Sequence, residues 1–398
     1  MRVLMLSWEY PPHVVGGLGK HVAEIVPTLA RQGVEIDLVT PWRAGGEMIE
    51  SFPGVTVHRV PAPQVDNQDF EAEVRAANEA LEAACDEIIA ERGSFDVLHN
   101  HDWLTSFAAQ AVKHRYKLPL IATIHATERG RGRGELVGEI AQRIDGAEWR
   151  LTYEAWRVIC CTRYMAREIM HYFSTPPDKI DVIPNGVDPS PYQALEDIDL
   201  STFRVRFALP GEKLVLYVGR VVSEKGVEVL LRSVPLGLAE MPEAKFVIAG
   251  KGPELERMRR LAHELYVSDK VLMPGFISDG DRDRLYMVAD CAVFPSLYEP
   301  FGIVALEAMA AKTPVVVSAV GGLPEVVRHA ETGITIYPGD VASCAWGIVH
   351  TLRHPEWAKQ RVENAYREVL TVFNWDTIAQ QTAAVYARVV EERRRTFW

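Results

Sequence analysis

The chain has 398 residues, of which 48% are hydrophobic and 24% charged, with a formal net charge of −11. This length exceeds one ordinary core, so we expect two domains. The acidic balance disfavours nucleic acid as a partner, and no apolar run reaches the roughly 18 residues of a membrane span. Because no secretory signal pattern is present and the five cysteines include no Cys-x-x-Cys pair, we expect a cytoplasmic protein without membrane association.

The N-terminal half opens with a strand, a glycine loop, a helix and a second strand. Residues 3–6 form a short apolar run, Gly16 and Gly17 lie in the following loop, and apolar residues then recur at helical spacing over residues 18–29. Residues 36–39 give the next strand. This order is typical of a Rossmann-like unit, in which backbone at the glycines can closely approach a phosphate. A plain tight turn is the alternative.

Further strands in this half end in polar residues. We expect strands at residues 55–60, 120–124 and 158–162, another ending near residue 103, and an acidic helix over 70–91. Asp102 and His125 follow two of these strands, where ligand sites of α/β proteins lie. Residues 128–134 are rich in glycine, which predicts a mobile loop.

The second half repeats the plan. Strands are expected at residues 214–218, 246–249, 271–277, 291–294, 315–318 and 334–336, with helical patterns between them, so the sheet should be parallel. Prolines near residues 188–199 indicate the boundary. We therefore expect one domain over residues 1–190 and a second over 191–377.

Residues 295–311 are expected to form a strand end, a loop and a helix N-terminus. Two prolines exclude a helix before Phe301, and apolar residues recur at helical spacing after it. Such a terminus attracts phosphate through its backbone N–H groups. These belong to Phe301, Gly302, Ile303 and Val304.

Two glutamates, Glu299 and Glu307, flank that helix N-terminus. Their eight-residue spacing corresponds to roughly 12 Å along a helix, wider than the carboxylate pairs of glycosidases. Two separate hydrogen-bonding roles on one extended ligand are therefore expected. Unrelated loop and helix-surface positions are the alternative.

A pair of cations follows the first strand of the second half. Gly219 and Arg220 are followed closely by Lys225 and another glycine. Two fixed cations can stabilise a departing diphosphate, although two solvated loop residues would look the same. No Asp-x-Asp clamp accompanies them, so we expect no metal.

Together these pieces resemble the retaining nucleotide-sugar glycosyltransferases of family four, and most closely those that are glycogen-synthase-like. The resemblance rests on the glycine loop, His-Asp-Trp at residues 101–103, Thr-Ile-His at 123–125, the Arg-x4-Lys pair and the Glu-x7-Glu pair. It implies an α/β fold of two Rossmann-like parallel-sheet domains facing across a cleft, called GT-B. It also implies a C-terminal helix, about residues 378–398, that crosses back to the first domain.

The resemblance also implies roles for the site residues. It implies that the reaction uses no cofactor. Glu307 would hold the ribose and Glu299 the donor sugar, while His125 would bond the sugar near its reacting carbon. Asp102 would orient His125 or the acceptor. The remaining roles would be donor binding at Gly16, Gly17, Gly219 and the four helix amides, and charge stabilisation at Arg220 and Lys225.

The expected function is transfer of glucose from ADP- or UDP-glucose to an α-1,4-glucan or oligosaccharide, with the mobile loop holding the acceptor through Arg129, Arg131 and Arg133. One departure is Val14, which stands where bacterial glycogen synthases carry lysine. The alternatives are a lipid acceptor, a small sugar acceptor as in sucrose- or trehalose-forming enzymes, and, from another class, a sugar-nucleotide epimerase. The first half holds more acidic than basic residues, which argues against a lipid surface.

Overall fold

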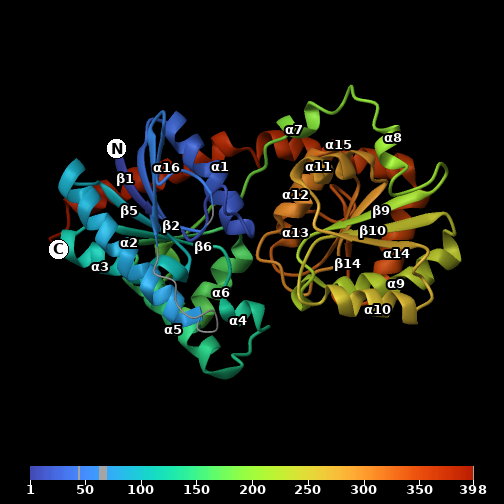
Figure 1. The fold of residues 1–398 in the computed structure, drawn as a ribbon, viewed down its shortest axis with the longest axis horizontal. Coiled ribbons are helices and arrows are strands. Elements are labelled where there is room, and N and C mark those ends of the chain that lie inside the picture. The colour runs from blue at the N-terminus through green and yellow to red at the C-terminus, as the bar shows by residue number, and fades with distance from the viewer. Residues whose placement is uncertain (44, 62–69, 398) are drawn as a thin grey trace. The chain divides into compact units, whose positions relative to one another are not determined.

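A computed structural model describes residues 1–43, 45–61 and 70–397 (Figure 1). The chain divides into two compact units, each with its own sheet. Unit 1 comprises Met1–Asn185 with Trp375–Trp398, and unit 2 comprises Gly186–Asn374. Among the described residues, no helix is both long enough and apolar enough to cross a bilayer.

Unit 1 is built on an eight-stranded sheet with the order β3-β4-β2-β1-β5-β6-β7-β8. All neighbouring strands are parallel except β3 and β4, which form an antiparallel edge that the sequence patterns did not predict. The strands are β1 Arg2–Leu6, β2 Glu35–Trp42, β3 Ile49–Phe52, β4 Val55–Pro61, β5 Val97–His101, β6 Leu120–Ile124, β7 Arg157–Cys160 and β8 Ile180–Val182.

Helices cover this sheet, and the C-terminal helix is one of them. Alternate β1 residues, Val3 and Met5, share a core cluster with helices α1 and α16, which pack side by side. Helix α16 therefore packs on the sheet of unit 1, as the resemblance to the GT-B fold implied. The helices are α1 Gly17–Arg31, α2 Phe70–Arg92, α3 Ser106–Tyr116, α4 Glu128–Arg131, α5 Gly138–Glu154, α6 Arg163–Phe173 and α16 Trp375–Arg394, with 3₁₀ turns η1 Trp103–Thr105 and η2 Pro177–Lys179.

Unit 2 is built on a six-stranded, wholly parallel sheet with the order β11-β10-β9-β12-β13-β14. Its strands are β9 Lys213–Val218, β10 Ala244–Ala249, β11 Val271–Gly275, β12 Cys291–Phe294, β13 Val315–Ser318 and β14 Ile334–Ile336. Its helices are α7 Ser190–Gln193, α8 Ser201–Arg204, η3 Ser223–Lys225, α9 Val227–Glu240, α10 Leu255–Glu264, α11 Asp279–Val288, α12 Ile303–Ala310, α13 Leu323–Val326, α14 Val341–Arg353 and α15 Pro355–Thr371.

The prediction of two parallel-sheet Rossmann-like domains is confirmed, and the strand orders show where ligands belong. Among the parallel strands of each sheet the order reverses at one point, between β1 and β5 in unit 1 and between β9 and β12 in unit 2. Ligands of open α/β sheets bind beyond the carboxyl ends of the strands at such switch points. The glycine loop and Asp102 lie at the first switch point, and the 219–226 and 295–302 loops lie at the second.

The prediction of a mobile loop over residues 128–134 is wrong for its first part, which is helix α4. Thr127 caps this helix, because its Oγ1 accepts a hydrogen bond from the Gly130 N–H at 2.9 Å. The buried carboxylate of Glu148 accepts the Glu128 N–H at 3.0 Å with each of its oxygens. These contacts satisfy N–H groups of the first turn, and they outweigh the low helix propensity of the glycines.

Candidate active site

At the switch point of unit 2 the two loops are locked to each other. Gly226 has φ +66°, and a Cβ atom there would lie 1.9 Å from the Pro295 carbonyl oxygen, so only glycine fits. The backbone N–H of Leu297 donates to the Glu224 carbonyl at 2.8 Å. The side chains that follow β9 and β12 are therefore held in a fixed mutual position.

An ion pair joins these loops. Lys225 Nζ lies 2.8 Å from Glu299 Oε2, and the two side chains are only 20% and 10% exposed. The backbone carbonyl of Glu299 accepts the Gly322 N–H at 2.8 Å, which fixes the peptide as well. A charge pair held this way at the end of a parallel sheet is preorganised for a polar ligand.

Arg220 is placed differently. Its side chain is half exposed and pairs with Glu224 at 2.9 Å, an i,i+4 contact within the same loop. Arg220 and Lys225 thus leave the same loop, as the sequence predicted, but each has a carboxylate partner. A diphosphate would have to share these cations with Glu224 and Glu299.

The helix that follows Glu299 begins as the prolines and glycine predicted. Gly302 caps α12 with φ +106°, and the first-turn N–H groups of Ile303 and Val304 have no acceptor within the helix. Further along, buried Glu307 accepts a hydrogen bond from Tyr286 Oη at 3.2 Å. Burial raises the pKa of Tyr286 well above its usual value, so this hydroxyl remains a donor.

In unit 1 the glycine loop already holds an anion from the chain itself. Glu9 Oε2 accepts the N–H groups of Val15 and Gly16 at 2.8 and 3.1 Å. A Cβ atom at Gly19 would lie 2.5 Å from this same oxygen. The carboxylate therefore stands at the N-terminus of α1, where the sequence pattern had suggested a phosphate.

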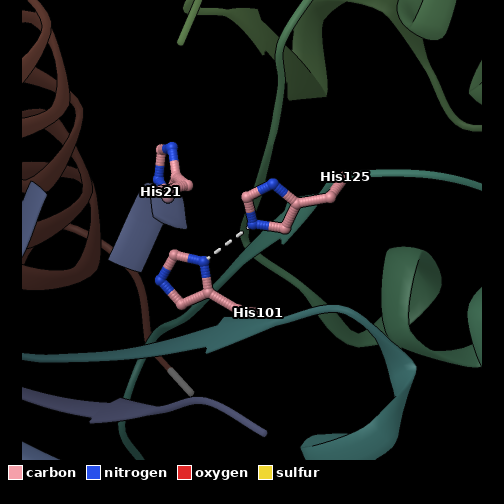
Figure 2. Close-up of side chains that lie close together, drawn as sticks. All are labelled: His21, His101 and His125. Atoms are coloured by element: carbon pink, nitrogen blue, oxygen red, sulfur yellow. Dashed lines mark hydrogen bonds between the residues drawn. The ribbon is translucent and has the colours of Figure 1, made fainter. Parts of the chain in front are cut away.

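A cluster of histidines lies at the other side of this switch point (Figure 2). His99 and His101 alternate on β5, so they share one face, and His125 follows β6 two residues after Thr123, the register partner of His101. His21, from α1, completes the cluster with ring centroids 4.8 Å from His125 and 5.5 Å from His101.

The predicted site residues Asp102 and His125 are in direct contact. Asp102 Oδ1 accepts the backbone N–H of His125 at 2.7 Å, so the carboxyl group positions the peptide that carries the imidazole. Asp102 itself has φ +56°. Burial raises the pKa of Asp102 to about 7, while burial and the nearby Arg131 charge lower the pKa of His125 to about 3.

The other cluster rings are also uncharged near neutral pH. Burial lowers the pKa of His21 and of His99 to about 3, and that of His101 well below its usual value. His101 Nδ1 and His125 Nε2 lie 3.1 Å apart in a hydrogen bond. Sequence reasoning identified only His125 as a site residue, although polar residues at alternate positions of a buried strand could have indicated His101.

The three arginines predicted to bind an acceptor differ in their contacts and exposure. Arg129 makes a bidentate contact with Asp145, at 2.7 Å from Nε and 3.0 Å from Nη2, so its guanidinium is engaged within unit 1. Arg131 is exposed and lies 3.9 Å from Glu128. Arg133 is exposed with φ +54°.

Comparisons with known proteins agree with this architecture. Residues 15–191 match the family described as Glycosyltransferase Family 4, and residues 201–368 match that described as Glycosyl transferases group 1. The chain is 38% identical to an uncharacterized glycosyltransferase of Methanocaldococcus jannaschii, over 98% of this chain and 99% of the relative. It is 34% identical to the glycogen synthase of Mycobacterium tuberculosis (97% and 94% covered), and 30% identical to the D-inositol 3-phosphate glycosyltransferase of Thermobispora bispora (96% and 92%).

Solved structures give the same result for the fold. The sucrose-phosphate synthase of Thermosynechococcus elongatus superposes with a TM-score of 0.82 at 25% identity, covering 98% of this chain and 99% of that one. The catalytic domain of starch synthase IV from Arabidopsis thaliana, bound to ADP and acarbose, superposes with a TM-score of 0.77 at 18% identity (98% and 99% covered). The chain has the GT-B fold and belongs to the family-four, glycogen-synthase-like glycosyltransferases.

Proposed function

We propose that the protein transfers glucose, with retention of configuration, from ADP- or UDP-glucose to an α-1,4-glucan or oligosaccharide. The observation that carries this proposal is the fixed Lys225–Glu299 pair at the N-terminus of α12. It combines a cation and helix N–H groups suited to a diphosphate with a carboxylate suited to sugar hydroxyls. Similarity to a glycogen synthase over nearly the whole chain supports glucan as the acceptor.

In this reaction the bond between the anomeric carbon and the diphosphate oxygen breaks, and a bond from that carbon to an acceptor oxygen forms. Lys225, Arg220 and the α12 amides would bind the diphosphate as its charge develops. The acceptor proton would pass to the departing phosphate oxygen, so no separate strong acid is required. Glu307 would bind the ribose hydroxyls, and Glu299 and the neutral His125 would bind the transferred sugar.

The donor is proposed to be a nucleotide-glucose. Starch synthase IV is described as bound to ADP, and another GT-B neighbour, from Anabaena, as bound to UDP-glucose. Both nucleotides are therefore candidates. Glu307 and its partner Tyr286 suit a ribose, which the two donors share.

A small sugar or a small phosphorylated polyol is the second candidate acceptor. Two similar proteins are named for products or acceptors of this size, a D-inositol 3-phosphate glycosyltransferase and a sucrose-phosphate synthase. Membership of a glycosyltransferase family favours transfer over the epimerase alternative.

Nucleotide release with a panel of donors and acceptors tests the proposal. ADP-, UDP- and GDP-glucose would each be combined with maltooligosaccharides, inositol 3-phosphate and fructose 6-phosphate. We expect release from ADP- or UDP-glucose that depends on maltooligosaccharide, with products lengthened by one glucose. Release only with a small phosphorylated acceptor would establish the second candidate, and no release with any pair would reject glucosyl transfer.

We further propose that transfer needs no metal ion, since Arg220 and Lys225 provide the positive charge. Activity should survive dialysis against EDTA. Loss of activity in EDTA with recovery on adding Mg²⁺ or Mn²⁺ would contradict this.

A further inference from the structure

We propose that His21, His101 and His125 bind one divalent transition-metal ion, above all Zn²⁺, through one ring nitrogen each. One such nitrogen from each ring lies within 4.8 Å of the other two, and Figure 2 shows the three rings lying close together. The transfer reaction, as proposed above, does not use an ion here. The site is therefore an additional property of this chain.

The spacing of the nitrogens suits zinc after a small adjustment. Zinc binds imidazole nitrogen at about 2.0–2.1 Å with tetrahedral geometry, which places two ligand nitrogens roughly 3.4 Å apart. His101 Nδ1 and His125 Nε2 are already 3.1 Å apart. Bringing the third ring in from 4.8 Å requires a shift of roughly 1.4 Å.

The hydrogen bond of His21 occupies one of its two ring nitrogens. His21 Nδ1 donates to Asn185 Oδ1 at 2.8 Å, which leaves Nε2 with its lone pair. A carbonyl oxygen on the non-ligating nitrogen is the usual support of a metal-binding histidine. The proton between His101 and His125 would move to the other nitrogen of its own ring, so each ring stays neutral.

His101 is fully buried, and one of its two ring nitrogens is unsatisfied. Its Nε2 has no hydrogen-bond partner among the residues that the structure describes, while its Nδ1 contacts His125. An ion at Nδ1 would replace that hydrogen bond with a metal bond, and Nε2 would carry the proton of the neutral ring.

The ligand type selects the ion. Three imidazoles without a carboxylate suit zinc, copper or nickel rather than magnesium or calcium, which prefer oxygen. Access is from the side of His125, since His125 is partly exposed whereas the other two rings are buried. A fourth position remains for water or a sugar hydroxyl.

Occupancy would inhibit glucosyl transfer, a consequence that rests on the proposed function. His125 is the ring assigned to the donor sugar, and an ion would take its lone pair. Micromolar Zn²⁺ should therefore inhibit transfer, and EDTA should restore it.

The binding test uses the whole chain without substrate. Chelator-treated protein would be equilibrated with Zn²⁺ and its metal content measured, and Co²⁺ would be added in parallel for its tetrahedral absorption bands. The variants are H125A and H21Q. The matched control is H350A/H354A, which removes another pair of neighbouring histidines, with ring centroids 4.9 Å apart, from unit 2.

We expect one Zn²⁺ per chain in the natural protein and in the control, and at least tenfold weaker binding in folded H125A and H21Q. Should either variant fail to fold, anomalous scattering from zinc-soaked crystals of the natural protein decides, with a peak expected between the three rings. No bound zinc, binding lost only in the control, or a peak only elsewhere would overturn the proposal. Zinc binding without inhibition would overturn only the consequence for transfer.

Discussion

The two switch points have the same strand topology, but they differ in the charge of the side chains around them. In unit 2 oppositely charged side chains form ion pairs, Lys225 with Glu299 and Arg220 with Glu224. In unit 1 the corresponding position holds uncharged imidazoles and Asp102, whose pKa is raised to about 7. The amides of the glycine loop in unit 1 already bind the carboxylate of Glu9.

Under the proposed function, this difference would assign a separate chemical task to each of the two sheets. Fixed cations beside a helix N-terminus suit a polyanion such as a nucleoside diphosphate. Neutral hydrogen-bonding rings suit uncharged sugar hydroxyls, where a fixed charge would have to be desolvated. The strand order places a site at each switch point, but the side chains decide its chemistry.

The largest effect is expected from breaking the charged site of unit 2. K225A and E299A should each lower kcat by roughly 10²–10³, the usual loss when one preorganised charge contact is removed. R232A is the matched control, because it removes an exposed ion pair with Glu228 in the same unit. Near-normal kcat in a folded K225A or E299A, measured by nucleotide release, would contradict the assignment.

The neutral site of unit 1 should give a smaller effect. H125A would remove the hydrogen bond that we propose between His125 and the transferred sugar, worth about 1–1.5 kcal/mol, so kcat should fall about tenfold. The donor KM should change little, since the groups proposed to bind the nucleotide lie in unit 2. H263A, at an exposed position on α10, serves as the control. A large rise in donor KM with unchanged kcat would place His125 in nucleotide binding instead.

The variant E9Q tests whether the charge of Glu9 keeps a diphosphate away from the glycine loop. E9Q keeps the shape of the side chain against Gly19 but removes its charge from the N-terminus of α1. If the donor diphosphate approaches these amides, its KM should fall about two- to fivefold, because a charge at a helix terminus is worth about 0.3–1 kcal/mol.

The control for that variant is E91Q on the exposed face of α2. The KM shift should shrink at high salt, as screening predicts. An unchanged KM at every salt concentration would show that the glycine loop does not bind the diphosphate.

The sequence predicted the sheets well, because their strands are short apolar runs between glycine and proline signals. It also predicted the 295–302 loop, where Pro295, Pro300 and Gly302 leave the backbone few choices. The sequence did not predict which side chains contact which partners. The Glu9 carboxylate binds the Gly16 amide seven residues away, and the His21–Asn185 hydrogen bond spans 164 residues.

The same limit explains the error at residues 128–134. Their composition indicated a loop, but a carboxylate twenty residues further along the chain, Glu148, stabilises the first turn of α4. Nothing in the local pattern reveals such a partner, since it depends on how α5 packs. Tertiary contacts override intrinsic propensity in this segment.

The smallest effects should separate the arginines of that segment. Arg129 contacts Asp145 through two nitrogens, so R129S should lower the free energy of unfolding by about 1 kcal/mol and the melting temperature of a unit of this size by about 2–4 °C.

The exposed Arg131 and Arg133 remain the predicted acceptor contacts. R131S/R133S should therefore raise the acceptor KM about two- to fivefold, as expected for one or two exposed hydrogen bonds, with the donor KM unchanged. Because R129S acts on the fold and the double variant on binding, comparing melting curves with acceptor KM separates the two roles. If R129S raised the acceptor KM as much as the double variant does, Arg129 would also be assigned to acceptor binding.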